Sequence, residues 1–150
     1  MKKKWEYKYP ERLVQAMVSE DHVLIGEKLY FVHMTNGSYP KAGIYCVDVN
    51  SGEAEAVYET YDFLRTVGVY RDGRFYFTSL RGNAYCVTTE GELKWTKLLG
   101  KEDGSVYFVN SVTGEEIKKK KKVKGACRGI AVCGGGIVAL SDKGPAVGMQ

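Results

Sequence analysis

Proline, histidine and tryptophan are scarce in this sequence of 150 residues, with 3, 2 and 2 copies respectively. Cysteine occurs four times, but never as an adjacent pair and never at the Cys-x-x-Cys spacing typical of zinc sites. Four cysteines in a chain of this length do not make a disulfide framework, so we expect a reducing, cytoplasmic setting. The composition therefore predicts neither a metal site nor a cross-linked, secreted scaffold.

Long apolar segments are also lacking. The basic start at residues 2–4 is not followed by the apolar stretch of a secretory signal. The longest weakly polar run, residues 129–140, is rich in glycine and too short to span a bilayer. We therefore predict no signal peptide, no membrane helix and no membrane partner.

What the chain does contain favours short strands joined by tight turns. It has 18 glycines and 11 tyrosines, and 44% of its residues are hydrophobic. Glycine suits turns, and aromatic side chains fit the pleated, half-buried surface of a sheet. The length allows one domain with its own core, which we place at residues 1–150.

A β-favouring triplet followed by a Gly-Glu turn recurs along the chain. The three copies are Tyr45-Cys46-Val47 with Gly52-Glu53, Tyr85-Cys86-Val87 with Gly91-Glu92, and Tyr107-Phe108-Val109 with Gly114-Glu115. The first two copies start 40 residues apart, a spacing typical of a four-stranded blade. A further hairpin precedes each of these two copies, the second through Asp72-Gly73. Residues 21–60 and 65–99 are each predicted to form four consecutive strands.

The predicted strands do not alternate between apolar and polar residues. Both the odd and the even positions of residues 29–34 are largely apolar, and Phe75-Tyr76-Phe77 repeats this pattern. A sheet that is wet on one side should alternate, whereas blades stacked against neighbouring blades are buried on both sides. The fold class predicted is all-β, with antiparallel four-stranded blades in an incomplete β-propeller of about three blades.

The segment from Gly82 to Trp95, Gly-Asn-Ala-Tyr-Cys-Val followed by Gly-Glu-Leu-Lys-Trp, resembles the repeat of the PQQ-like (pyrroloquinoline-quinone-type) β-propellers. In that family a Tyr-Ala-Leu-Asp-like strand leads into Thr-Gly-Glu-x-x-Trp. The copy at Gly114 has Lys118 where the tryptophan would fall, and the copy at Gly52 has Ala56 there. Trp5-Glu6-Tyr7 resembles the strand that follows such a turn. Quinoprotein enzymes of the family carry vicinal cysteines beneath their cofactor. This sequence has no adjacent cysteines, so we predict no cofactor.

The pattern loosens after Leu99. Residues 105–110, 115–123, 127–133 and 136–141 are predicted to form either a third, irregular blade or two half-blades in exchanged order. With a strand at residues 5–9 the total is about thirteen, whereas a closed propeller needs about sixteen. The chain would pair with other copies, be a fragment of a longer protein, or close as a smaller barrel or sandwich. Residues 10–20 also fit one or two helical turns.

A lysine run at residues 118–124 sets the charge of the chain. Without its six lysines the chain would have 16 basic and 18 acidic residues, so a formal charge of +4 would become −2. An anion-facing patch for nucleic acid or acidic lipid is one interpretation. An edge strand protected by charge is the other, and it is favoured because no arginine or aromatic residue is interleaved for base stacking.

Other chemistry-bearing residues indicate structural roles. Cys46 and Cys86 occupy matching repeat positions and are predicted to pack as small apolar side chains. His22, expected at a turn, and His33, at a strand end, lie near no nucleophile motif. The stretch at residues 48–53 resembles a calcium loop, but its glycine comes one place too early, so we interpret it as the repeat's hairpin turn.

One loop differs between the two repeats. Residues 34–43 stand where the second repeat has only residues 79–82, and such insertions often map to a binding face. We predict a contact patch of Tyr39, Lys41 and Arg81, with a tolerated surface insertion as the alternative. The function predicted is a non-enzymatic interaction or scaffold module with a protein partner or self-association. The alternatives are part of a propeller-type enzyme whose site lies outside this chain, or an anion binder through the lysine run.

Overall fold

The computed structural model describes residues 2–7, 16–35, 41–64, 66–79, 81–99, 105–122, 127–133, 136–141 and 147–149. Every regular element in these ranges is a β-strand, which confirms the all-β prediction. The first sheet has the order β1-β2-β3-β4 and consists of β1 (Ala16–Ile25), β2 (Lys28–Thr35), β3 (Ala42–Asp48) and β4 (Ala54–Thr60). The second has the order β5-β6-β7-β8 and consists of β5 (Val69–Arg71), β6 (Arg74–Thr78), β7 (Asn83–Thr88) and β8 (Leu93–Leu98). All neighbours in both sheets are antiparallel, so both predicted four-stranded segments are confirmed.

The strands after residue 100 form two smaller sheets. One pairs β9 (Ser105–Val109) with β10 (Glu116–Lys122), and the other joins β11 (Cys127–Cys133), β12 (Gly136–Ser141) and β13 (Val147–Met149). These strands therefore do not make one third blade, and their division fits the alternative of two half-blades. The β9–β10 turn ends in the same Gly-Glu as the β3–β4 turn, so this pair corresponds to the two outer strands of a blade.

Two local predictions are wrong where the structure describes them. Residues 16–20 belong to β1 and not to a helix, because Ala16 and Met17 pair with Thr35 and Met34 of β2. Residues 5–7 form no strand, and the rest of both predicted segments, residues 8–15, lies outside the described residues. The short strand β13 was not predicted.

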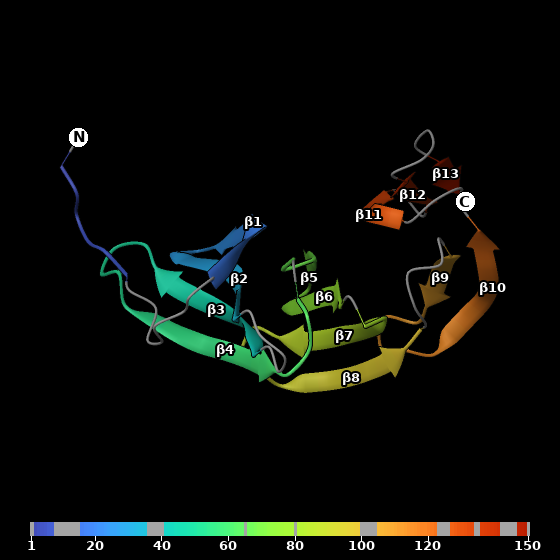
Figure 1. Cartoon of the computed structure of the whole chain (residues 1–150), viewed down its shortest axis with the longest axis horizontal. Coiled ribbons are helices and arrows are strands. Elements are labelled where there is room, and N and C mark those ends of the chain that lie inside the picture. The colour runs from blue at the N-terminus through green and yellow to red at the C-terminus, as the bar shows by residue number, and fades with distance from the viewer. Residues whose placement is uncertain are drawn as a thin grey trace.

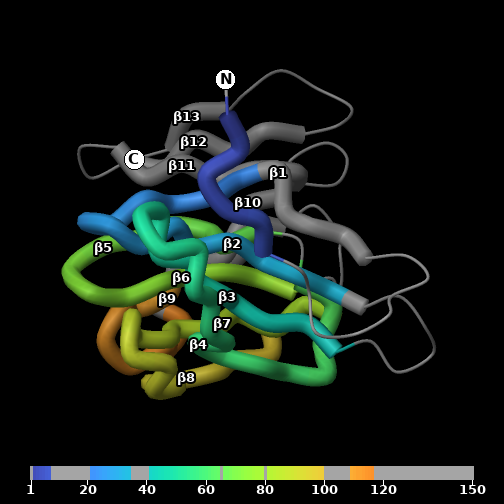
Figure 2. The backbone as a smooth tube through the Cα atoms, turned by 90° about the vertical axis from the view of Figure 1, so that its left-hand side faces the viewer, coloured from blue at the N-terminus to red at the C-terminus, as the bar shows by residue number. Residues whose placement is uncertain are grey.

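The sheets follow one another along an arc (Figure 1). The fourth strands β4 and β8 lie on the outer rim of the arc, and β1 and β5 lie on its inner side. In the turned view the strands of the first sheet descend in order from β1 near the top towards β4 near the bottom (Figure 2). This arrangement, in which the first two sheets pack face to face, is that of an incomplete β-propeller.

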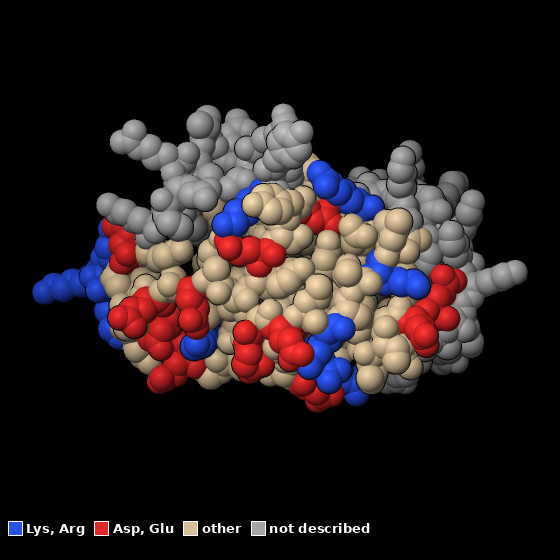
Figure 3. Space-filling view, turned by 90° about the horizontal axis from the view of Figure 1, so that it is seen from below, with Lys and Arg blue, Asp and Glu red and all other residues tan. Residues whose placement is uncertain are grey.

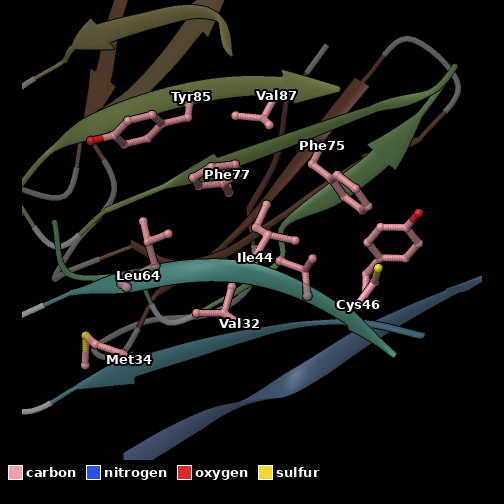
Figure 4. Packing of buried hydrophobic residues seen from close by; sticks show 12 residues of the cluster. Val32, Met34, Ile44, Cys46, Leu64, Phe75, Phe77, Tyr85 and Val87 are labelled. Carbon is pink, nitrogen blue, oxygen red and sulfur yellow. The ribbon is translucent and has the colours of Figure 1, made fainter. Parts of the chain in front are cut away.

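Three of the four central strands, β2, β3 and β7, are buried on both faces, as the missing alternation predicted, whereas β6 alternates, with Tyr76 half-buried between the buried Phe75 and Phe77. Along β2, residues 30–34 are all buried, with Tyr30 5% and Phe31 7% exposed. The side chains that face the second sheet form one cluster with Phe75, Phe77, Tyr85 and Val87 (Figure 4). Neighbouring sheets therefore shield each other from water, and this apolar burial is the main stabilising term between them.

The outer rim carries charges of both signs. Acidic and basic side chains are interspersed on the face seen in Figure 3. Strand β4 contributes Glu55 and Glu59, and β8 contributes Lys94 and Lys97. Because β4 and β8 end their sheets, these charges discourage edge-to-edge association with other strands.

Candidate functional site

The turn between β3 and β4 is held by the side chain of Asp48. Its Oδ1 accepts hydrogen bonds from the backbone N–H groups of Asn50 and Ser51, both at 2.8 Å. These bonds hold the pKa of Asp48 below its usual value. Gly52 then takes a φ of +81° and donates its N–H to the carbonyl of Asp48 at 2.8 Å. A left-handed residue is required here, which explains the glycine.

The turn between β9 and β10 repeats this geometry. Asn110 replaces the aspartate, and its Oδ1 accepts from the N–H groups of Val112 at 2.8 Å and Thr113 at 3.1 Å. Gly114 has a φ of +72° and donates to the carbonyl of Asn110 at 2.8 Å. The recurring turn predicted from the sequence is therefore confirmed for these two copies, and the calcium-loop likeness of residues 48–53 is explained by a side chain that caps its own turn.

A tryptophan lies against the glycine of each of these turns. A Cβ on Gly52 would lie 2.7 Å from Cγ of Trp5, and a Cβ on Gly114 would lie 2.7 Å from Cδ2 of Trp95. Each indole also donates Nε1–H to the second residue of the turn, the carbonyl of Val49 at 2.9 Å and that of Ser111 at 3.0 Å. We call this contact the indole staple. It joins one sheet, or the segment before the first sheet, to the turn of the next.

The interface between the first and second sheets has no indole staple. The β7–β8 turn is one residue shorter, because the N–H of Gly91 donates to the carbonyl of Thr88 at 3.0 Å. A Cβ on Gly91 would lie 2.0 Å from the carbonyl oxygen of Val57 in β4. Backbone therefore replaces the ring at this interface, and only glycine leaves room for it.

Strand register identifies which residue replaces the tryptophan. Trp95 pairs with Cys86 in β7, and the residue that pairs with the matching Cys46 in β3 is Glu55. Counting from the turn glycine in the sequence instead predicts Ala56 at the position that matches Trp95. The difference of one residue arises because β8 has its irregularity just before Trp95, whereas β4 has its own after Ala56.

A cavity of about 400 Å³ lies at this central interface, and we call it the inter-sheet groove. It is lined by residues of both sheets, namely Ile25, Lys28, Tyr30, Glu55, Ala56, Val57, Tyr70, Thr89 and Glu90. The glutamate that replaces the tryptophan is part of its wall. The groove therefore coincides with the interface that lacks an indole staple.

The charges in the groove are arranged in pairs. Lys28 Nζ lies 2.7 Å from Oε1 of Glu55, and this hydrogen bond holds the pKa of Glu55 below its usual value. The Thr89 hydroxyl donates to Glu90 Oε1 at 2.6 Å and likewise lowers the pKa of Glu90. Burial raises the pKa of Tyr30, so its phenol stays protonated at neutral pH. Two carboxylates and one ammonium thus face the groove.

The repeat cysteines are buried, as predicted, with Cys46 2% and Cys86 0% exposed. Burial, followed by the hydrogen bond to Glu55, raises the pKa of Cys46 to about 11, so the thiol is protonated at neutral pH. His33 is buried edge-on against Tyr45, with ring centroids 5.7 Å apart. His22 lies exposed on β1 and not in the turn expected, because β1 is longer than the sequence predicted.

The predicted contact patch lies at the opposite ends of the strands from the turns. Lys41 forms an ion pair of 2.8 Å with Glu59. Arg81 lies 3.8 Å from Asp62, and its guanidinium is 5.2 Å from the centre of the Phe63 ring. Tyr39 lies outside the described residues. The binding role of all three stays a prediction.

Asp62 forms a buried polar cluster beside Arg81. Its Oδ2 accepts from Asn83 Nδ2 at 2.8 Å and from the Tyr85 hydroxyl at 2.7 Å, and its Oδ1 accepts from the Phe63 N–H at 2.8 Å. Burial by itself would raise the pKa of Asp62, but the hydrogen bonds outweigh it and lower the pKa. This cluster ties the β4–β5 connection to β7, and sequence reasoning missed it because Asp62 belongs to no motif.

Replacing Tyr85 with phenylalanine tests this cluster. Burial, and then the bond to Asp62, raises the pKa of Tyr85 to about 12, above the value of about 10 in an unfolded chain. The stabilisation is therefore complete below pH 10 and lost as the pH rises towards 12. We expect Tyr85→Phe to cost about 1 to 2 kcal/mol at pH 8 and less at pH 11, measured by urea unfolding at both values. An equal cost at both pH values would contradict the assignment.

Replacing Trp95 with phenylalanine tests the indole staple. We expect a loss of about 1 kcal/mol in the free energy of unfolding, because the bond to the Ser111 carbonyl is removed while most apolar contact remains. In this variant Gly114→Ala should be as destabilising as it is in the parent chain, because an aromatic ring still lies against residue 114. Urea unfolding measures both effects, and a Trp95→Phe variant as stable as the parent would show that the hydrogen bond of the staple contributes nothing to stability.

No group of three or more histidine, cysteine, aspartate or glutamate side chains in the described ranges is placed to hold a metal ion. In the same ranges no helix is long and apolar enough to cross a membrane.

Four-stranded antiparallel sheets stacked along an arc, with their fourth strands on the rim, define this chain as an incomplete β-propeller. Its structure is similar to that of BamB from Moraxella catarrhalis, a β-propeller, with a TM-score of 0.53 and 11% sequence identity. The match covers 91% of this chain and 63% of that chain, so it spans less than two thirds of BamB's length. No protein-family profile matches the sequence, and no curated protein is detectably similar. At this identity the likeness shows the fold alone.

Proposed function

We propose that this chain is a non-enzymatic, propeller-type interaction module whose incomplete arc is continued by another copy of the chain or by a protein partner. The observation that carries the proposal is that the contacts between successive units all run in the same direction along the chain. Trp5 lies on the turn of the first sheet, β4 lies on the turn of the second, and Trp95 lies on the turn at Gly114. Each unit thus offers a fourth-strand position to the turn of the next unit.

Two further features support this proposal. The two complete sheets make an arc and not a ring, and burial of both faces is what stabilises such sheets. The BamB likeness adds support from the fold. The proposal also includes two finer points. The units are PQQ-like repeats, and the setting is cytoplasmic, with free thiols at Cys46 and Cys86.

The ends of the strands near Asp62 supply a second contact surface. Tyr61 is 72% exposed next to the buried Asp62, and Arg81 and Lys41 lie at the same ends of the strands. We propose that this edge, together with Tyr39, presents the inserted loop to a protein partner. An exposed tyrosine near an arginine is a composition that protein interfaces favour.

The mass of the chain in solution tests whether another copy continues the arc. We expect light scattering of the purified chain to give a dimer or larger closed assembly, and a cooperative thermal transition whose midpoint rises with protein concentration. A monomer that unfolds cooperatively, with no dependence on concentration, would overturn the continued arc. Shortening the loop within residues 36–40, which leaves β2 and β3 whole, should leave the assembly intact and abolish binding of a partner that the full chain retains, and unchanged binding would remove the loop from the proposal.

A further inference from the structure

The inter-sheet groove exists because a glutamate stands where neighbouring units place an indole. In the second sheet Trp95 pairs with Cys86 and covers the following turn, whereas in the first sheet Glu55 pairs with Cys46. The carboxylate is more polar and much smaller than an indole. Beside the close approach of β4 at Gly91, it leaves a space between Glu55 and the turn residues Thr89 and Glu90 that is open to a ligand.

Two tyrosine rings form the rigid part of the groove. Both rest on the fully buried Phe75, with ring centroids 5.0 Å away for Tyr30 and 5.4 Å for Tyr70. A ring packed against a buried ring has little freedom to move aside. Tyr30 is only 5% exposed, so the fixed aromatic surface open to a ligand is that of the half-buried Tyr70, on which a planar cation stacks favourably.

The charge of the groove favours a cation as well. Among the residues that line it, Glu55 and Glu90 supply two carboxylates and Lys28 supplies one ammonium group. Lys28 and the Cys46 thiol both bond to the same oxygen of Glu55, Oε1, at 2.7 Å and 3.5 Å. Glu90 bonds to the neutral hydroxyl of Thr89, and none of the ion pairs among the described residues includes it. An additional positive group would balance the second carboxylate.

We propose that the inter-sheet groove binds an arginine side chain of the protein partner, with its guanidinium between the Tyr70 ring and the Glu90 carboxylate. This inference rests on the proposed function and names the chemistry of the partner. Arginine suits the site because its planar fork pairs with a carboxylate while its face lies on an aromatic ring. Charge complementarity favours an arginine over a tryptophan side chain, because the Glu55 carboxylate stands where an indole would lie.

Binding of short peptides tests the proposal. The probes are acetyl-Gly-Arg-Gly-amide and the same peptide with citrulline, which keeps the shape and removes the charge. We expect the arginine peptide to shift the amide resonances of Glu55, Thr89 and Glu90 saturably, and the citrulline peptide to shift none of them. Equal binding of both peptides, or shifts confined to other parts of the chain, would overturn the proposal.

Three variants sharpen this test. Glu90→Gln should raise the dissociation constant of the arginine peptide roughly three- to tenfold, because one charge-assisted pair is lost. Glu92→Gln removes the same charge from the same turn, where it pairs with Lys94 at 2.7 Å outside the groove, and should leave the constant unchanged. Glu55→Trp should fill the groove and abolish binding while the chain stays folded. Identical effects of the changes at Glu90 and Glu92 would refute a site at the groove.

The two proposals fail separately. An assembled chain that shows no binding of the arginine peptide loses the groove and keeps the proposed function. A strictly monomeric chain that still binds the peptide through Glu90 loses the continued arc and keeps the groove.

Discussion

Replacing Phe75 with alanine is expected to lower the free energy of unfolding by about 3 to 5 kcal/mol. Phe75 is fully buried and contacts the rings of Tyr30 in the first sheet and Tyr70 in its own. Truncation removes apolar burial and leaves a cavity that the surrounding strands fill only in part. Urea unfolding followed by circular dichroism measures the loss.

Leu98→Ala is the matched control for this prediction. Leu98 lies in the same sheet but is 69% exposed, so its truncation should change stability by less than about 0.5 kcal/mol. Comparable losses for the two variants would mean that the sheets do not pack through Phe75. If Phe75→Ala is unfolded at rest, Phe75→Leu should still fold and show a smaller loss.

Gly91→Ala is expected to cost roughly 3 to 5 kcal/mol, from strained backbone and overpacking together. Gly91 has a φ of +87°, which disfavours any side chain, and a Cβ would lie 2.0 Å from the Val57 carbonyl oxygen. Val57 is part of β4, so the clash cannot be relieved by turning a side chain. The first and second sheets must separate at the turn, and denaturant unfolding should report the loss.

Gly73→Ala separates strain from packing. Its φ is +75°, close to that of Gly91, but an added Cβ would meet nothing within 4 Å. The expected cost is therefore about 1 kcal/mol, from the backbone alone. If the two glycine variants lose the same stability, the close approach of β4 to the β7–β8 turn is not present in solution.

Much of the fold was predictable because it follows from local patterns. Strands with two apolar faces, such as residues 29–34, require cover on both sides, and Asp72-Gly73 fixes a hairpin. Both features depend on neighbours in sequence. The division after residue 100 was left open, since pairing of separate strands depends on distant partners that the pattern does not name.

The candidate site was less predictable. The sequence pointed to tryptophan after the turn, but it could not show that Trp5 and Trp95 lie on the turn of another unit. One-residue irregularities in β4 and β8 moved the matching position from Ala56 to Glu55. Such shifts leave no mark in composition or periodicity. Asp62, one acid among 18, gave no signal at all.

The indole staple is a head-to-tail contact, since the surface that gives the ring differs from the surface that receives it. Contacts of this kind are heterologous, so nothing in the contact itself limits the number of units that can be added. Their outcome depends on the rotation between successive units, which closes a ring at one angle and extends a helical filament at another. The short turn at Gly91, which brings β4 backbone against the next sheet without a ring between, sets that rotation at the central step. Lengthening this turn by one residue would therefore change the curvature of the whole array.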